Sequence, residues 1–572
     1  MIDYDYSQSV VKALDVVPCG VAICCLVLHP CFGGRPEDLL TQAWKVTFYL
    51  SYTCQLYTHA DSFIHSKSYK AGEIIIEETP LIVFSPKKAD QITAVRNQFQ
   101  NIKADKKVSH EGCIHDLDIP AAIDAKQRNE FRGMLLAASS YALLEDDAVK
   151  AKIQQLYSPN VGENDADSET ETNEYEKNVI LLAEEAVSFL KRQVKPSTPL
   201  HALIHKSPKE CIAVMLIWSC NAFKGGYIYE ITSRINHSCD FNAVVSTDPF
   251  SNDEKQTIRA VSDISAGDEI SISYLGSFTY ADFKARNERL ISEKFFCCEC
   301  TRCKRDRSVG DVASSVPCPK CHVRTGRYLE EDIQYDDGEV EVNYCVPCVK
   351  NGDKTTYSCS KCGDVDLQKS LSKAMDTAIE RAVSHLEEGL AGQSEIDDDE
   401  GERDAKIEMT ERLTCLATSV LGAKHWATNL LIFVMLSAKL SSLHAVMLCK
   451  SAGDDASKGD DDEADLMNDI AECIDSLERV SSYVKSLNLK SHGGHLVGNI
   501  SVGVARVLVG FGDVKSMKYG ATFATSVYEE YFKLGFEGQG METVVETLIN
   551  AWKRRTGDAD CDDEQQKKRQ KV

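Results

Sequence analysis

Two separated parts of the chain alternate apolar and polar residues, and this period of two predicts short β-strands in both. The first part, residues 59–86, reads as strand, turn and strand, with the turn at Ala71-Gly72. The second part, residues 226–280, contains short strands separated by turn-forming residues. In its last strand, 269–274, isoleucines alternate with serines, so Tyr274 is expected to share a face with the isoleucines.

Apolar residues recur at helical spacing in two longer regions, 87–225 and 366–552. The first region is a helical insertion between the two β parts, and its acidic stretch 162–176 predicts an exposed loop. The second is a series of amphipathic helices joined by acidic linkers. Consecutive helices of this length predict an array of the tetratricopeptide (TPR) type, with an ordinary helical bundle as the alternative. Together these patterns predict an α+β protein.

Composition limits the domain count and the kinds of partner. The chain has 572 residues, a length typical of about three to four domains, and 43% of its residues are hydrophobic. Its net charge of -24 argues against a protein that coats nucleic acid through a basic surface. An acidic body would attract a basic partner such as a lysine-rich tail, although acidic charge commonly serves solubility alone.

The N-terminal segment 1–58 is apolar and contains several cysteines, and no role is assigned to it. Its longest apolar run, 16–32, is broken by prolines and is preceded by aspartates rather than by basic residues. The run is also shorter than the roughly 20 residues that a membrane-spanning helix needs. An irregular or packed segment is therefore expected in preference to a signal peptide, and no membrane association is expected.

The 23 cysteines favour metal binding over disulfide bonds, because many of them occur as Cys-x-Cys or Cys-x2-Cys. A reducing compartment is therefore expected. Cys298, Cys300 and Cys303 lie within six residues, and a tetrahedral Zn2+ needs a fourth ligand, for which Cys239 is a candidate. Reduced structural cysteines without metal are the alternative, and Cys297 is a spare thiol.

A second cysteine region offers six thiols for one tetrahedral site. The pairs are Cys318 with Cys321, Cys345 with Cys348, and Cys359 with Cys362. The first and third pairs are similar to the two knuckles of a zinc ribbon, with strands expected between them around 339–344. These four cysteines are the favoured ligands of a second zinc, and the middle pair could replace either of them.

Three motifs follow one another between residues 236 and 303. They are Asn236-His237-Ser238-Cys239 with Asn242, Gly267-Asp268-Glu269-Ile270 leading to Tyr274, and Phe296 followed by Cys298, Cys300 and Cys303. Together they resemble the signature motifs and post-SET cysteines of SET-domain lysine methyltransferases. The resemblance spans roughly residues 60–310 with a gap in the middle. The long helical insertion and the helical C-terminal region are similar to the SET-and-MYND subgroup.

The resemblance implies methyl transfer from S-adenosylmethionine to a protein lysine, with the two substrates entering from opposite faces and aligned by the enzyme. The residues implied are Tyr274 for catalysis, Asn236, His237 and Phe296 for the cofactor, and Phe223 and Tyr229 for the lysine channel. Taken singly, Tyr274, His237, Phe223 and Phe296 are each better explained as ordinary structural residues, three as part of the core or its edge and His237 as a satisfied polar residue. Their arrangement in one set of motifs favours the functional interpretation.

The chain departs from the family pattern in three places. Ala60-Asp61-Ser62 stands where the family has Gly-x-Gly beside the cofactor, and Phe241 stands where a proline is common. The insertion 87–225 has only three cysteines, so no MYND-type zinc array is expected within it. Two alternatives follow: a zinc-stabilised scaffold that has lost cofactor binding, and an adaptor that binds proteins through residues 366–552.

The tail carries two basic triplets, 553–555 and 567–569, which are separated by eleven residues and are similar to a bipartite nuclear import signal. A monomer in the nucleus, the cytoplasm or both is expected. Its expected partner is a protein with a basic, lysine-containing segment, such as a histone in chromatin, and no direct nucleic-acid binding is expected.

The predicted domains, in chain order, are an unassigned segment 1–58, the first part of the SET domain 59–86, the helical insertion 87–225, the second part of the SET domain 226–280, a post-SET zinc segment 281–310, a zinc-ribbon-like segment 311–365, a helical TPR-like domain 366–552 and a tail 553–572.

Overall fold

The computed structural model of the chain describes most of the residues between 67 and 526. The described residues are 67–84, 88–100, 117, 119–121, 123, 125–159, 174–223, 226–247, 255–323, 344–350, 354–365, 367, 369–391, 400–451, 460–490, 494–511, 518, 520–523, 525–526 and 550. The chain divides into two compact units, 1–62 and 63–572, and every described residue lies in the second. The predictions for segment 1–58, for Ala60-Asp61-Ser62 and for the tail therefore lie outside the described residues.

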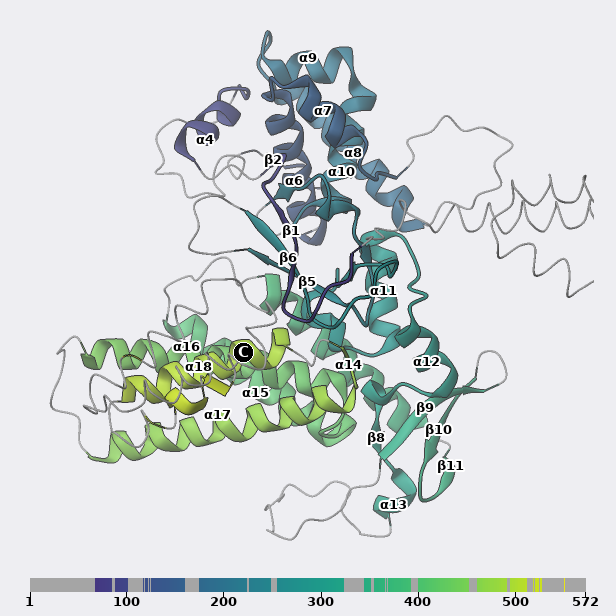
Figure 1. Cartoon of the computed structure of the whole chain (residues 1–572), viewed down its shortest axis with the longest axis vertical. Helices are drawn as coiled ribbons and strands as arrows, with labels where there is room; N and C mark the ends of the chain where they lie inside the picture. Colours follow the sequence, from purple (N-terminus) through teal and green to yellow (C-terminus); the bar gives the residue numbers. More distant parts are fainter. Residues whose placement is uncertain are drawn as a thin grey trace, which may run out of the picture. The chain divides into compact units, whose positions relative to one another are not determined.

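A three-stranded sheet joins the two β parts of the sequence (Figure 1). The strand β1 (Ile74–Glu78) pairs antiparallel with β6 (Gln256–Ala260), and β6 pairs antiparallel with β5 (Ala243–Thr247). A shift of register between Ile74 and Ile76 bends β1, as a β-bulge does. The strand that precedes the helical insertion is thus completed by strands that follow it.

The two β parts of the sequence also form two separate pairs of two-residue strands. The strand β2 (Ile82–Val83) pairs antiparallel with β3 (Tyr227–Ile228), and β4 (Asn236–His237) pairs parallel with β7 (Ser271–Ile272). Each pair again joins segments that are far apart in the chain, so both depend on packing around them rather than on their own length.

The predicted strand 269–274 is shorter than its alternation suggests, because only Ser271–Ile272 pairs as a strand. Its faces are nevertheless as predicted. Ile270 and Ile272 are buried in one apolar cluster, and Tyr274 packs against the same cluster. Alternation along the chain therefore identified the buried face correctly, whereas it overestimated the extent of backbone pairing.

The insertion is helical in its described part. Its helices are α4 (Ala89–Arg96), α6 (Ala125–Ala142), α7 (Asp147–Gln154), α8 (Glu174–Gln193), α9 (Pro199–Lys206) and α10 (Pro208–Asn221). The rings of Phe131 in α6 and Phe189 in α8 meet edge to face, with centroids 5.7 Å apart, inside one buried cluster. Gly133 permits close packing of α6 on α10, because a Cβ atom there would lie 1.9 Å from the Trp218 ring.

Two helices follow the second β part. The helix α11 (Phe283–Lys294) begins at Asp282, whose carboxylate caps it by accepting a hydrogen bond from the Ala285 amide at 2.8 Å. It ends at Phe295, which adopts the left-handed conformation with φ of 64°. The helix α12 (Thr301–Val309) follows. The turn between them carries Cys298 and Cys300, and the first turn of α12 carries Cys303.

The second cysteine region forms a small sheet. Its strands are β8 (Val316–Pro317), β9 (Tyr344–Lys350), β10 (Lys354–Cys359) and β11 (Gly363–Val365), all antiparallel, in the order β11-β10-β9-β8. The short helix α13 (Pro319–Val323) follows β8. The strands predicted around 339–344 are described only from Tyr344, where β9 begins.

The C-terminal region is helical. Its described helices are α14 (Lys369–Ala391), α15 (Glu400–Leu421), α16 (Trp426–Ser451), α17 (Asp460–Ser486) and α18 (Gly494–Phe511). The helix α16 packs against the four others. A central helix shared in this way fits a bundle as well as a TPR-like array, so the repeat arrangement stays a prediction.

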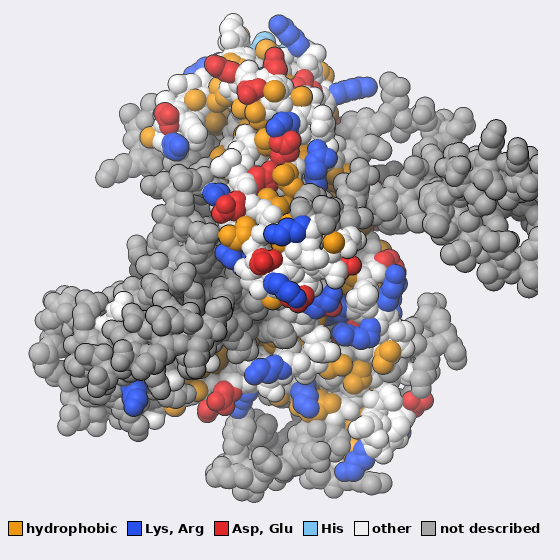
Figure 2. All heavy atoms as spheres, viewed as in Figure 1, with side chains coloured by type: hydrophobic (Ala, Val, Ile, Leu, Met, Phe, Trp, Pro, Cys, Tyr) orange, Lys and Arg blue, Asp and Glu red, His pale blue; other side chains and the backbone are white. Residues whose placement is uncertain are grey.

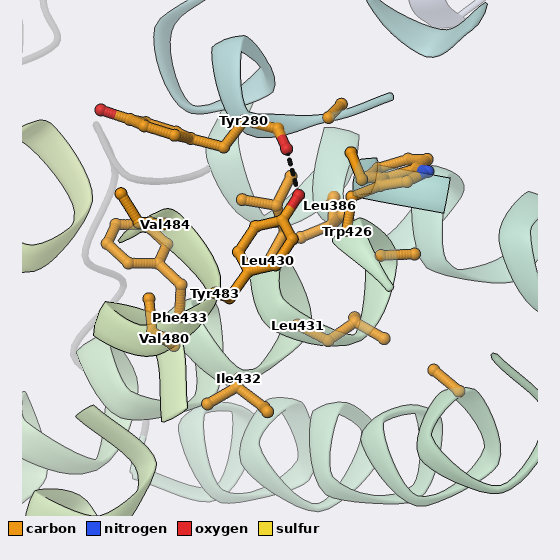
Figure 3. Packing of buried hydrophobic residues seen from close by; sticks show 14 of the residues in the cluster. Tyr280, Leu386, Trp426, Leu430, Leu431, Ile432, Phe433, Val480, Tyr483 and Val484 are labelled. Atoms are coloured by element: carbon orange, nitrogen blue, oxygen red, sulfur yellow. Dashed lines mark hydrogen bonds between the residues drawn. The ribbon is translucent and has the colours of Figure 1, made fainter. Parts of the chain in front are cut away.

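Within α16, the window Trp426–Leu443 is long and apolar enough to cross a membrane, but 67% of it is buried inside the protein. Such burial is typical of a core helix. Figure 3 shows this core, in which Trp426, Leu430 and Leu431 share one buried cluster with Tyr483 of α17. The Tyr483 hydroxyl donates a hydrogen bond to the Tyr280 carbonyl. The helical region is thus bonded directly to the 3-10 helix η2 (Gly276–Tyr280) that follows β7.

Candidate active site and cysteine clusters

The first cysteine cluster consists of the four residues that the sequence analysis proposed. The sulfur atoms of Cys239, Cys298, Cys300 and Cys303 all lie within 4.8 Å of one another. The Cys239 sulfur lies 3.5 Å from that of Cys303 and 3.9 Å from that of Cys298. Zn–S bonds of about 2.3 Å in a tetrahedron place sulfur atoms about 3.8 Å apart. The donor set therefore fits zinc.

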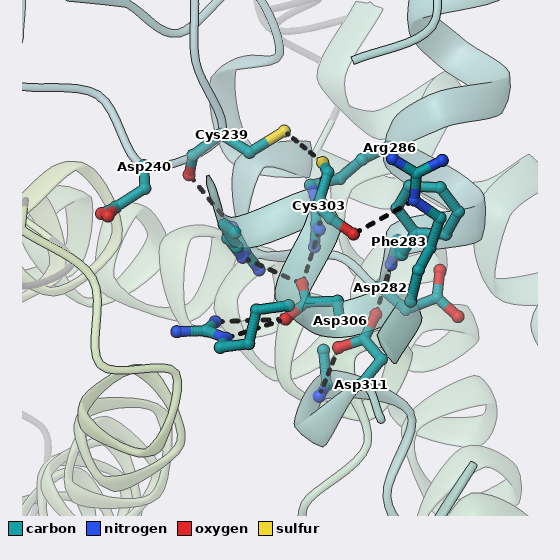
Figure 4. A network of polar contacts seen from close by, with 12 residues as sticks. Cys239, Asp240, Asp282, Phe283, Arg286, Cys303, Asp306 and Asp311 are labelled. Atoms are coloured by element: carbon teal, nitrogen blue, oxygen red, sulfur yellow. Dashed lines mark hydrogen bonds and ion pairs between the residues drawn. The ribbon is translucent and has the colours of Figure 1, made fainter. Parts of the chain in front are cut away.

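Two buried guanidinium groups contact this cluster, and Figure 4 labels one of them, Arg286, together with Cys239 and Cys303. Arg286 places Nη2 3.7 Å from the Cys303 sulfur and 2.8 Å from Oδ2 of Asp306, and Arg302 donates to the carbonyl of Cys239 at 3.3 Å. Buried Asp306 pairs with both groups, with Arg286 at 2.8 Å and with Arg302 at 3.5 Å, and so already offsets part of their charge. Four thiolates around one Zn2+ carry a net charge of about −2, which is compatible with the positive charge that remains.

Basic side chains also gather on the surface beside this cluster. In Figure 2, Lys and Arg side chains are visible over the region of α11 and α12. The exposed ones on these helices include Lys284, Lys304 and Arg305. In a chain with a net charge of -24, this local excess of positive charge is a further counterweight to a thiolate cluster.

His237 links the cysteine cluster to Tyr274. Its Nδ1 accepts a hydrogen bond from the backbone N–H of Tyr274 at 3.0 Å, and its Nε2 lies 3.3 Å from the Cys239 sulfur. Because a backbone N–H can only donate, Nδ1 carries no proton, so the neutral ring is protonated at Nε2 and donates toward sulfur. Desolvation lowers the pKa of His237 to about 3, which keeps the ring neutral.

Tyr274 lies two residues after β7, beside the rings of His237 and Phe296. Its ring centroid lies 5.3 Å from that of His237 and 6.4 Å from that of Phe296, and its hydroxyl donates to the Ile235 carbonyl at 2.5 Å. Desolvation first, and the charge of Glu269 second, raise the pKa of Tyr274. The structure therefore brings together three residues that the motifs singled out, with the tyrosine as a neutral phenol.

Carboxylates on two elements orient the turn that carries Asn236. The side-chain amide of Asn236 donates a hydrogen bond from Nδ2 to Oε1 of Glu269 at 2.8 Å. Glu78, at the end of β1, accepts hydrogen bonds from the Ile231 and Thr232 amides at 2.8 and 3.0 Å, and these residues begin the turn that leads into β4. These bonds fix the backbone on both sides of Ile235. The role of Asn236 and His237 in cofactor binding stays a prediction.

The two predicted channel residues contact each other. The rings of Phe223 and Tyr229 meet edge to face with centroids 5.5 Å apart. Phe223 is half-buried and packs against the apolar cluster that also supports Tyr274, whereas Tyr229 is fully buried. The role of both residues in a lysine channel stays a prediction. Phe241, which departs from the family pattern, is buried with Val244 and Val261 in a small cluster of its own.

The second cysteine cluster consists of the four cysteines that were favoured as ligands of a second zinc. The sulfur atoms of Cys318, Cys321, Cys359 and Cys362 all lie within 4.8 Å of one another, and that of Cys321 lies 3.2 Å from that of Cys362. Cys345 is buried directly opposite Cys359 in the β9–β10 register, so a fifth thiol lies beside the set. The Cys348 side chain lies outside the described residues. These four cysteines could bind a second zinc ion.

Sequence reasoning missed two groups at the site. Glu269 belongs to a quoted motif, yet nothing in the motif tells which side chain it binds. Lys294 is the last residue of α11, and its ammonium group lies 6.0 Å from the Tyr274 ring centroid. A basic residue at the end of a predicted helix is common, so the sequence offers no signal for this contact.

The comparison with known families agrees with this geometry. Residues 65–275 match the family model described as SET domain. The matched segment contains β1, the helical insertion and β3 to β7, and it ends one residue after Tyr274. The chain therefore contains a SET domain.

Three curated relatives show which proteins with a SET domain this chain is similar to. The chain is 38% identical over 79 residues to a SET and MYND domain-containing protein of Dictyostelium discoideum, a match that covers 14% of this chain and 22% of the relative. It is 30% identical over 122 residues to protein-lysine N-methyltransferase SMYD4 of Danio rerio, covering 16% of each. It is 34% identical over 94 residues to N-lysine methyltransferase SMYD2-A of Xenopus laevis, covering 15% of this chain and 20% of the relative.

These matches therefore span at most 22% of the length of each relative. Within that extent, the chain is similar to SET-and-MYND proteins, as its motifs suggested.

We predict that the purified protein contains about two zinc ions per chain and that Cys300→Ser removes about one of them, because three thiolates hold zinc less tightly than four. Elemental analysis by mass spectrometry measures this. Cys297→Ser is the matched control, since the exposed Cys297 adjoins the cluster without belonging to it. Unchanged zinc in Cys300→Ser, or equal loss in the control, would contradict the assignment.

We predict that His237→Phe destabilises the protein by about 1–3 kcal/mol, because it leaves the Tyr274 amide without its acceptor. His237→Asn should lose less, since its Oδ1 can replace Nδ1 as the acceptor. Urea unfolding of the two variants measures the difference. Equal losses in both would show that the hydrogen bond to Tyr274 does not matter.

Proposed function

We propose that this chain is an S-adenosylmethionine-dependent protein lysine N-methyltransferase. The observation that carries the proposal is the position of Tyr274, which follows β7 of the SET domain with its hydroxyl on the Ile235 carbonyl and its ring beside His237 and Phe296. The names of two relatives, both of them lysine methyltransferases, support the same reaction.

Tyr274 orients the amine in this proposal. S-adenosylmethionine supplies an electrophilic methyl group on a sulfonium. The Tyr274 hydroxyl donates a hydrogen bond to the Ile235 carbonyl, so the lone pairs of its oxygen can accept a hydrogen bond from an incoming amine. Because burial raises the pKa of this phenol, it acts as a neutral acceptor and not as a phenolate base. Its contribution is orientation and stabilisation of the charge that develops on nitrogen.

The residues around Tyr274 fit the two substrates. Half-buried Phe296 offers an aromatic surface to the adenine ring, and the Asn236 amide offers polar contacts to the rest of the cofactor. Phe223 and Tyr229 form an aromatic wall that favours a lysine side chain and the cation formed from it. The neutral His237 adds no positive charge that would repel the sulfonium.

We further propose that the substrate is a lysine in a basic protein segment, with a histone tail as one candidate. The net charge of -24 supports this, because it attracts basic segments over long range. The basic triplets of the tail support a location in the nucleus, the cytoplasm or both.

We predict that Tyr274→Phe lowers the rate of methyl transfer roughly a hundredfold or more, because it removes the oxygen that orients the amine. The rate is measured with isotopically labelled S-adenosylmethionine on cell extract, and the modified lysines are identified by mass spectrometry. Tyr175→Phe is the control, since this tyrosine is 50% exposed on α8.

Zinc content should be the same in both variants and in the wild type. A Tyr274→Phe variant that is as active as the control would refute the proposed role of this tyrosine.

A further inference from the structure

Lys294 connects two segments that the proposed mechanism treats separately. Its Nζ donates a hydrogen bond to the Cys220 carbonyl at 2.8 Å and reaches the Ser219 carbonyl at 3.4 Å. The same ammonium group lies 6.0 Å from the Tyr274 ring centroid, within the range of a cation–π contact. One side chain thus touches the end of α10 and the ring of the proposed catalytic tyrosine.

The charge of Lys294 is well placed for the first of these contacts. Ser219 and Cys220 are in the last turn of α10, where carbonyl groups lack partners within the helix and the helix dipole is negative. Hydrogen bonds from an ammonium group to such carbonyls are stronger than those between neutral groups. Lys294 is only partly exposed, so water competes less for them than at the surface.

The end of α10 leads directly to the aromatic wall. Ala222 is extended and Phe223 follows, with its amide bonded to the Tyr227 carbonyl at 2.9 Å. At the other end of the contact, Lys294 is followed by Phe295 in the left-handed conformation, which turns the chain toward Phe296. Lys294 therefore ties the segment of Phe223 to the turn that carries Phe296.

We propose that Lys294 is a positioning residue that holds the Phe223 wall against Tyr274 and so sets the width of the lysine channel. This inference rests on the proposed methyltransferase function. Without the contact, α10 would keep its helical core and the hydrogen bonds of Ser219 to Glu130 and of Asn221 to the Tyr157 carbonyl, but its last turn would lose its link to α11 and to the Tyr274 ring. The channel would then grip the substrate lysine less firmly, while Phe296 would keep its own contacts with His237 and Tyr274.

The test compares three variants of the full-length protein. Lys294→Met keeps the length of the side chain and removes its charge and its hydrogen-bond donors. Lys294→Arg keeps the positive charge and the donors. Lys284→Met is the matched control on the same helix, because Lys284 is exposed and pairs only weakly with Glu288 at 3.9 Å.

Hydrogen exchange tests the contact without relying on activity. In Lys294→Met, the Phe223 and Gly226 amides should exchange about tenfold faster, because the turn that protects them opens more often. Amides in the middle of α11 should be unchanged. Lys294→Arg and Lys284→Met should both behave as the wild type. Normal exchange at Phe223 and Gly226 in Lys294→Met would overturn the proposal.

Kinetics tests the consequence for the channel. Lys294→Met should raise the KM for the protein substrate about tenfold while the KM for S-adenosylmethionine changes less than twofold, and Lys294→Arg should restore the first. A parallel rise of both KM values would indicate general disruption and would overturn the channel role. If the wild type transfers no methyl group, the proposed function fails, whereas the exchange result still decides whether Lys294 holds this segment.

Discussion

The candidate site depends on one short parallel contact, in which Asn236 pairs with Ser271 and His237 with Ile272. Two residues on each side cannot hold such a pairing alone. The Ser238 amide extends it by donating to the Ile272 carbonyl at 3.0 Å, and Asn242 accepts from the Ser271 amide at 2.9 Å. This contact brings the carbonyl of Ile235 and the hydroxyl of Tyr274 within hydrogen-bonding distance.

The first cysteine cluster supports this pairing from one side. Cys239 lies two residues after β4 and meets Cys298 and Cys300 from the turn before α12 and Cys303 from the first turn of α12. The imidazole of His237 contacts the Cys239 sulfur through Nε2 and the Tyr274 backbone N–H through Nδ1, so it links the cysteine cluster to Tyr274. A metal in this cluster would therefore stabilise the position of the tyrosine as well as the local fold.

The same region is continuous with the helical core. Cys239, Cys298 and Cys303 belong to one buried cluster with the residues of α14, α16, α17 and α18. The amide of Lys490, beyond α17, donates to Asp240 at 2.9 Å, one residue after the cysteine ligand. The α-helical region thus contacts the turn that carries Cys239 and Asp240. Loss of these contacts is expected to shift the residues of the site.

Sequence patterns predicted the parts of this arrangement that depend on local periodicity or spacing. Alternation identified the buried face of Ile270 and Ile272. Cysteine spacing identified three thiols of the first cluster, with Cys239 as the candidate fourth, and it favoured the four thiols of the second without excluding the middle pair. These signals are legible because a strand has a fixed period and zinc needs four nearby donors. The lengths of β4 and β7 were not predictable, since they depend on packing from distant segments.

Contacts between distant side chains were also hidden from the sequence. Nothing in the His237 motif indicates that its ring would lie between a sulfur and a backbone amide. The buried partners Arg286 and Asp306 look like ordinary surface charges of a helix when read along the chain, because their burial arises only from the fold. Lys294 is hidden for the same reason.

We propose that this SET domain binds S-adenosylmethionine, and calorimetric titration of the purified protein with that compound tests this most directly. We expect saturable binding of about one molecule per chain, because one set of residues around Tyr274 forms the proposed site. Absence of detectable binding to folded, zinc-loaded protein would contradict it and would favour a scaffold that has kept the fold without the chemistry.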